Sequence, residues 1–125
     1  SASRQICKDL LDEGAKLSIH DPKVSPSQIA LDLKIDPKSK TNNYLITNST
    51  NEGIWEMADS IEEALLEADA AIILTEWDEY TKIDWKAGYN SMRKPAWVFD
   101  SRSIIKPEKV TNEGLNFWRL GDGLI

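Results

Sequence analysis

Two nearly continuous apolar segments, AAIILT (70–75) and KPAWVFD (94–100), constrain the fold of this chain more than any other feature. Short apolar runs of this kind are typical of strands that are covered on both faces of a sheet. Segments with helical periodicity alternate with these and other strand candidates along the chain. This alternation predicts an α/β fold, a doubly wound, mostly parallel Rossmann-like sheet with helices on both faces.

The expected elements follow from periodicity and from capping residues. Ser25 followed by Pro26 is a typical helix start, and Asp84 can cap the helix that follows it. The stretch 34–53 is polar and rich in turn residues, so we expect a surface loop there. Helices are expected at 3–13, 25–33, 60–70, from 85 onwards and at 107–114, and strands at 16–21, 54–58, 70–75, 94–100 and 115–121.

Length and charge narrow the class of protein. A chain of 125 residues is expected to form one domain, residues 1–125. A net charge of -6 argues against binding to nucleic acid over a broad surface. No apolar run approaches the roughly 20 residues of a membrane span. The single cysteine, Cys7, excludes an internal disulfide and fits the reducing environment of the cytoplasm.

In a parallel sheet of this type, the ligand crevice lies beyond the carboxyl ends of the strands. Three of the expected strands end there in polar or aromatic residues. We therefore expect the wall of a binding site at Asp21, Thr75, Glu76, Trp77, Asp100 and Ser101, with Arg102 directly beyond it.

Arg102 is the strongest candidate for ligand contact. The guanidinium has a fork of donors that suits phosphate oxygens, and Arg102 follows a buried strand by two residues. The alternative is a surface arginine paired with a nearby carboxylate, and the residues alone leave both open. For Trp77, stacking on a ligand ring competes with packing at the sheet edge.

The other site candidates also have structural explanations. Glu76 can be an acidic residue at a helix start, Asp100 a cap at a strand end, and Asp21, before a proline, part of a turn. One histidine and one cysteine give no ligand set with metal-site spacing. No glycine-rich phosphate loop is present. We therefore expect neither catalytic residues nor a metal site in this chain.

Several motifs together resemble a known family. EGAKLSIHDPKV, ILTEWDEY, RKPAWVFDSRSI and EGLNFWRLG are similar, in order and spacing, to the C-terminal domain of the UDP-glucose/GDP-mannose dehydrogenase family, and within it to the UDP-glucose branch. The resemblance covers nearly the whole chain outside the 34–53 loop. Its specific parts are TEW and FDSR.

The resemblance implies a part in the oxidation of UDP-glucose to UDP-glucuronate with two NAD. In that family an N-terminal domain binds NAD and carries the catalytic cysteine, the C-terminal domain binds the UDP portion, and the enzyme is a homo-oligomer. Arg102 matches the arginine of the family's F-D-G-R motif, which contacts the nucleotide-sugar. Ser101 departs from that motif, where glycine is usual. Cys7 does not match the catalytic cysteine.

Two further expectations concern the chain as a whole. A doubly wound fold ordinarily opens with its central strand, whereas this sequence opens with a helix. The strand at 16–21 is therefore expected not to pair with the strand at 70–75. The alternative to a dehydrogenase domain is a free-standing, non-catalytic α/β module used for ligand sensing or assembly.

Overall fold

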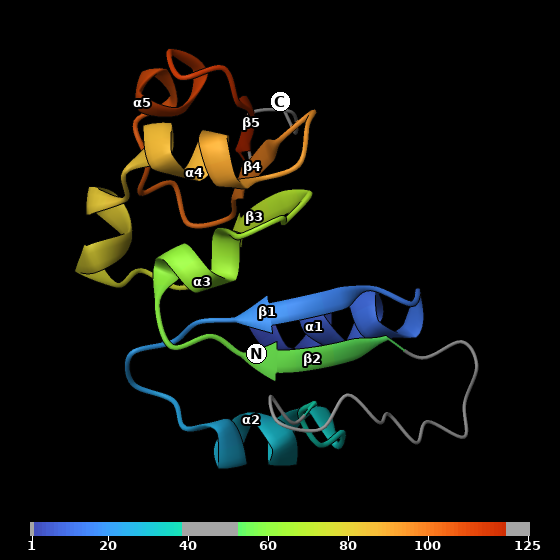
Figure 1. Cartoon of the computed structure of the whole chain (residues 1–125). Helices are drawn as coiled ribbons and strands as arrows, with labels where there is room; N and C mark the ends of the chain where they lie inside the picture. Colours follow the sequence, from blue (N-terminus) through green and yellow to red (C-terminus); the bar gives the residue numbers. More distant parts are fainter. Residues whose placement is uncertain (1, 39–52, 120–125) are drawn as a thin grey trace. The chain divides into compact units, whose positions relative to one another are not determined.

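The computed structural model describes residues 2–38 and 53–119, which form two compact units, Ser1–Ser60 and Ile61–Ile125. All strands pair in parallel, and helices alternate with them (Figure 1). The fold is therefore α/β and Rossmann-like, as the apolar segments predicted. The elements lie where periodicity placed them, and most are one to three residues shorter than expected. The helix expected at 60–70 is shorter still and covers Ile61–Leu65. The part of the loop at 39–52 lies outside the described residues.

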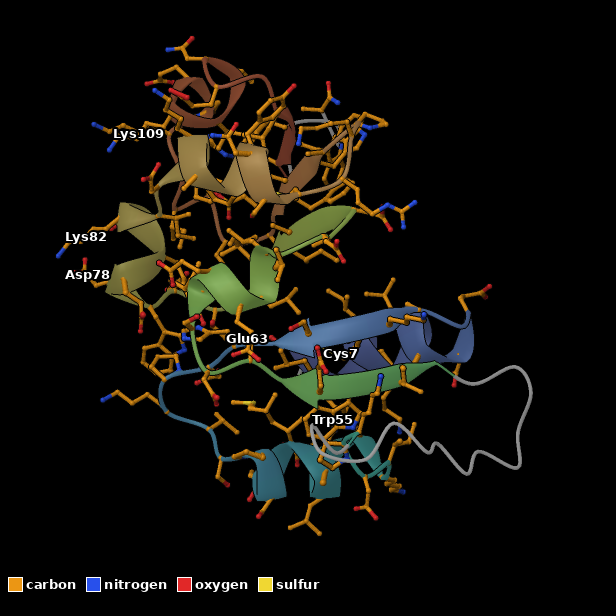
Figure 2. All side chains as sticks on the ribbon, in the orientation of Figure 1. Cys7, Trp55, Glu63, Asp78, Lys82 and Lys109 are labelled. Carbon is orange, nitrogen blue, oxygen red and sulfur yellow. The ribbon has the colours of Figure 1, made fainter. Side chains whose placement is uncertain are left out.

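The first unit contains two helices and two strands. Its elements are α1 (Ala2–Asp12), β1 (Lys16–Ile19), α2 (Pro26–Leu33) and β2 (Ile54–Met57). The side chain of Ser25 accepts a hydrogen bond from Gln28 N–H and caps α2, as the sequence predicted. Trp55, only 1% exposed, is at the centre of the core of this unit (Figure 2). Its indole N–H donates to the carbonyl of Ile35 at 2.8 Å.

The second unit contains a three-stranded sheet in the order β3-β4-β5. Its elements are α3 (Ile61–Leu65), β3 (Ala70–Ile73), the 3₁₀ helix η1 (Asp78–Lys82), α4 (Trp85–Ser91), β4 (Trp97–Asp100), α5 (Pro107–Thr111) and β5 (Asn116–Arg119). Asp84 caps α4 by accepting from Ala87 N–H, as predicted. The helices α4 and α5 lie beside the sheet (Figure 1, orange and red).

The core of the second unit forms between the helices and one face of its sheet. Ala71 and Ile73 of β3 and Val98 of β4 belong to the same apolar cluster as Trp85 of α4 and Val110 of α5. The other residues of the strands point to the opposite face because strand side chains alternate. Ile72, Trp97 and Trp118 are 38 to 41% exposed there.

The strand pairing divides the described strands between two sheets. Among the described residues, β1 pairs with β2 and β3 pairs with β4, and no pairing joins β1 to β3. The strands thus fall into a two-stranded and a three-stranded parallel sheet.

Candidate functional site

The carboxyl ends of β3 and β4 bring two of the predicted segments together. The two strands are parallel, with Ile73 opposite Asp100. The segments that continue from them, 74–77 and 101–105, therefore leave the sheet at the same edge. This register places Glu76 near Arg102, although the two residues are 26 positions apart in the sequence.

A fully buried carboxylate holds the loop after β4. Asp100 has no exposed surface. Its Oδ1 accepts a hydrogen bond from Arg102 N–H, and its Oδ2 accepts from Ile104 N–H and Ile105 N–H, each at 2.9 Å. Charged groups are rarely buried without partners, and three donors compensate this one. Asp100 therefore acts as the expected cap and fixes the backbone that carries Arg102.

Ser101 ties the same loop to β3. Its N–H and its hydroxyl both donate to the carbonyl of Ile73, at 3.1 and 2.6 Å. Ser101 occupies the position where the F-D-G-R motif has glycine. Its hydroxyl is engaged in a hydrogen bond within the chain. Ser103 adopts a left-handed backbone with φ of 58°, and the two N–H groups that follow it reach back to Asp100. Sequence reasoning missed these contacts, because they depend on the register between two strands.

The side chain of Arg102 forms an ion pair with Glu76. Their closest atoms, Nη2 and Oε1, are 3.1 Å apart, and the two side chains are 45% and 56% exposed. This is the carboxylate pairing that the sequence left open for a surface arginine. Because the pair is half exposed, it stabilises the fold by at most about 1 kcal/mol. The guanidinium is therefore positioned at the sheet edge and remains accessible to solvent.

Glu76 is not the acidic residue at a helix start that the sequence suggested. The 3₁₀ helix η1 starts two residues later, and its N-cap position is Trp77, which makes no side-chain cap bond. The acids in the first turn of η1 are Asp78 and Glu79, and Asp78 pairs with Lys82 at 3.0 Å on the exposed surface (Figure 2). The carboxylate of Glu76 is thus left for Arg102.

Trp77 and Thr75 complete the segment after β3. Trp77 is partly buried and packs against the core of the second unit. Its Nε1 is buried and has no hydrogen-bond partner among the described residues. The packing alternative for this indole thus accounts for its position. Thr75 is partly buried in the bend that leads from β3.

Asp21 belongs to the first unit, whereas the other candidates belong to the second. Its Oδ1 accepts hydrogen bonds from Lys23 N–H at 2.8 Å and Val24 N–H at 3.0 Å. This arrangement is a turn closed by an aspartate side chain, as the following proline suggested. The turn explains why aspartate occurs at this position.

Cys7 belongs to the first unit, whereas the edge at β3 and β4 belongs to the second. Cys7 lies on α1 and packs against the core of the first unit, and burial raises the pKa of its thiol (Figure 2). A protonated thiol is a poor nucleophile. In residues 2–38 and 53–119, no three His, Cys, Asp or Glu side chains are grouped to hold a metal ion. Among the same residues, no helix has the length and apolar character needed to cross a bilayer.

Comparison with known proteins adds independent information. Residues 1–107 match the model of the UDP-glucose/GDP-mannose dehydrogenase family, UDP binding domain. UDP-glucose 6-dehydrogenase of Drosophila melanogaster is 34% identical over an alignment of 131 positions, and the match covers 97% of this chain and 24% of that protein. UDP-glucose 6-dehydrogenase 1 of Arabidopsis thaliana is 34% identical over an alignment of 122 positions, and the match covers 95% of this chain and 25% of that protein. The chain thus spans about a quarter of the length of these relatives.

A solved structure supports the fold. The NDP-N-acetyl-D-galactosaminuronic acid dehydrogenase of Methanosarcina mazei superposes with a TM-score of 0.52 at 19% sequence identity. The match covers 96% of this chain and 28% of that one. At this identity the likeness concerns the fold alone.

Proposed function

Since this chain belongs to the UDP-glucose/GDP-mannose dehydrogenase family and matches its UDP-binding domain, we propose that it binds the UDP portion of a UDP-sugar through Arg102. UDP-glucose and UDP-glucuronate are the ligands we propose, because the relatives named above are UDP-glucose 6-dehydrogenases.

The observation that carries this proposal is the way the chain presents Arg102. A fully buried aspartate and the bonds of Ser101 fix the backbone of the loop, while the guanidinium is half exposed at the edge where ligands bind in parallel α/β sheets. A fixed backbone lowers the entropy that is lost when the side chain meets a phosphate oxygen. The guanidinium then supplies charge-assisted hydrogen bonds to the diphosphate.

We further propose that the chain acts as part of a cytoplasmic homo-oligomeric enzyme that oxidises UDP-glucose to UDP-glucuronate with NAD. In such an enzyme this chain holds and orients the nucleotide. Its own residues do not fit NAD, because the sequence has no G-x-G-x-x-G loop to receive a dinucleotide. The redox chemistry and the NAD site are therefore assigned to other parts of the enzyme.

Titration of the ¹⁵N-labelled chain with UDP, followed by NMR, tests the binding proposal. We expect saturable shifts of the amides at 74–77 and 100–105 and of the Arg102 side chain. Uridine, which lacks the diphosphate, is the control and is expected to cause much smaller shifts there. Absence of saturable shifts, or shifts confined to other segments, would refute the proposal and favour the assembly module.

A further inference from the structure

The structure places a carboxylate where the proposed ligand would bind. Glu76 Oε1 lies 3.1 Å from Arg102 Nη2, at the edge of the sheet that carries the candidate site. Carboxylates and phosphates bind arginine through the same N–H donors. A phosphate oxygen that approaches Arg102 therefore competes with Glu76 for these donors.

The surroundings of the pair favour exchange over a permanent bond. Both side chains are about half exposed, and ion pairs of this kind are weak. The backbones on both sides are held independently of the pair, by Asp100 and Ser101 on one side and by the packed Trp77 on the other. The two side chains can therefore separate without a change in the fold.

If Glu76 stayed paired with Arg102 while a diphosphate bound, two anions would contact the same guanidinium. A carboxylate within a few ångströms of a bound diphosphate repels it, and this repulsion is strongest where the ligand excludes water. The diphosphate carries more negative charge than Glu76 and can offer several oxygens to the same donors. Displacement of Glu76 therefore relieves the repulsion and keeps Arg102 paired.

From this geometry we propose that Glu76 is an internal competitor that positions Arg102 in the free chain and is displaced by the diphosphate. The inference rests on the proposed function and deepens it. Glu76 keeps the guanidinium at the site while no ligand is bound. The affinity for the diphosphate is lower as a result, because the ligand must displace Glu76. The exchange also favours anionic nucleotides over neutral nucleosides, because a neutral nucleoside has no group that can take the place of the carboxylate.

The test is a double-mutant cycle on UDP binding, measured by titration. Glu76→Gln removes the charge and keeps a similar shape, and we expect UDP to bind about two- to fivefold more tightly. In the Arg102→Ala background the same substitution should leave the affinity unchanged. Glu79→Gln is the matched control, because it removes an equally negative and exposed side chain from the neighbouring η1. Glu76→Ala should raise the affinity as Glu76→Gln does.

Three outcomes would overturn the inference. They are an unchanged or weaker affinity for Glu76→Gln, an equal gain in the Arg102→Ala background, and an equal gain for Glu79→Gln. Either of the last two results would mean that removal of a negative charge raises the affinity for UDP in general, without an exchange at Arg102. The proposed function fails by a different result, namely if Arg102→Ala alone binds UDP as tightly as the unchanged chain.

Discussion

At the scale of single residues, environment gives two carboxylates different roles beside the same arginine. Asp100 is completely buried and accepts three backbone N–H groups, so it is fixed. Glu76 is half exposed and has the Arg102 side chain as its partner, so it can exchange. The residue types alone do not distinguish these roles. Burial and the number of donors decide them.

Asp100→Asn should destabilise the fold. The amide has one oxygen in place of two, so at least one of the three N–H groups loses its acceptor in a buried site. We expect a loss of about 1–3 kcal/mol in the free energy of unfolding, measured by urea denaturation. Asp69→Asn is the control, because Asp69 is 77% exposed in its pair with Arg93 and should change stability little. Equal stability of the Asp100→Asn and unchanged chains would show that Asp100 does not hold the loop.

Cys7 should make stability fall at alkaline pH. Burial raises the pKa of its thiol in the folded chain above the ordinary 9.0, so the folded state favours the neutral form. The resulting stabilisation is complete below pH 9.0 and is lost as the pH rises through the folded-state pKa. Urea denaturation across this pH range, compared with Cys7→Ala, measures it. Identical pH profiles for the two chains would contradict the assignment.

At the scale of elements, the sequence predicts what depends on local chemistry. Apolar runs indicated β3 and β4, and Ser25 and Asp84 capped their helices as expected. The 3₁₀ helix η1 was not predicted, because its sequence DEYTK contains a single apolar residue, Tyr80, and so shows no helical periodicity. The sequence allowed a carboxylate partner for Arg102, but it did not identify Glu76 as that partner. The pairing depends on the register of two strands and on the loop that Asp100 holds, both of which are tertiary features.

Gly53, which precedes β2, marks a close approach of two backbones. A Cβ atom there would lie 2.0 Å from the carbonyl oxygen of Ala15, which also accepts the N–H of Ile54. Gly53→Ala should therefore disturb the pairing of β1 with β2 and lower the free energy of unfolding by about 1–3 kcal/mol. Thermal and urea denaturation measure this loss.

Gly88→Ala is the matched control for Gly53→Ala. Its added Cβ would meet side-chain atoms of Leu65 and Trp85 at 3.3 Å or more, and side chains adjust more easily than backbone. Alanine also has the higher helix propensity. Gly88→Ala should therefore cost less stability than Gly53→Ala. A larger loss of stability for Gly88→Ala than for Gly53→Ala would show that the close backbone contact is not the reason why position 53 requires glycine.

At the scale of the whole molecule, the chain contains two compact units, and the proposed ligand contact lies in the second. Its elements supply the edge at which we propose that the nucleotide binds, and its sequence has no dinucleotide loop. The relatives that it matches are about four times as long. Binding of the nucleotide and oxidation of the sugar are therefore proposed to reside in different parts of the enzyme.

The 125-residue chain should accordingly show no dehydrogenase activity of its own. Incubation with UDP-glucose and NAD, followed by absorbance of NADH, should give the rate of a protein-free blank. The partly buried Cys7, whose thiol has a raised pKa, is a poor alternative nucleophile. Turnover above the blank that is lost in Cys7→Ala would contradict this division of roles.

The proposed binding of UDP depends most on Arg102, and the affinity of Arg102→Ala for UDP tests it most directly. Removal of charge-assisted hydrogen bonds costs about 1.5–3 kcal/mol, so the dissociation constant should rise roughly 10- to 150-fold. Arg93→Ala, which removes another exposed arginine paired with a carboxylate, should leave UDP affinity nearly unchanged. If Arg102→Ala and Arg93→Ala both bound UDP like the unchanged chain, Arg102 would be a surface residue and the proposed binding site would be wrong.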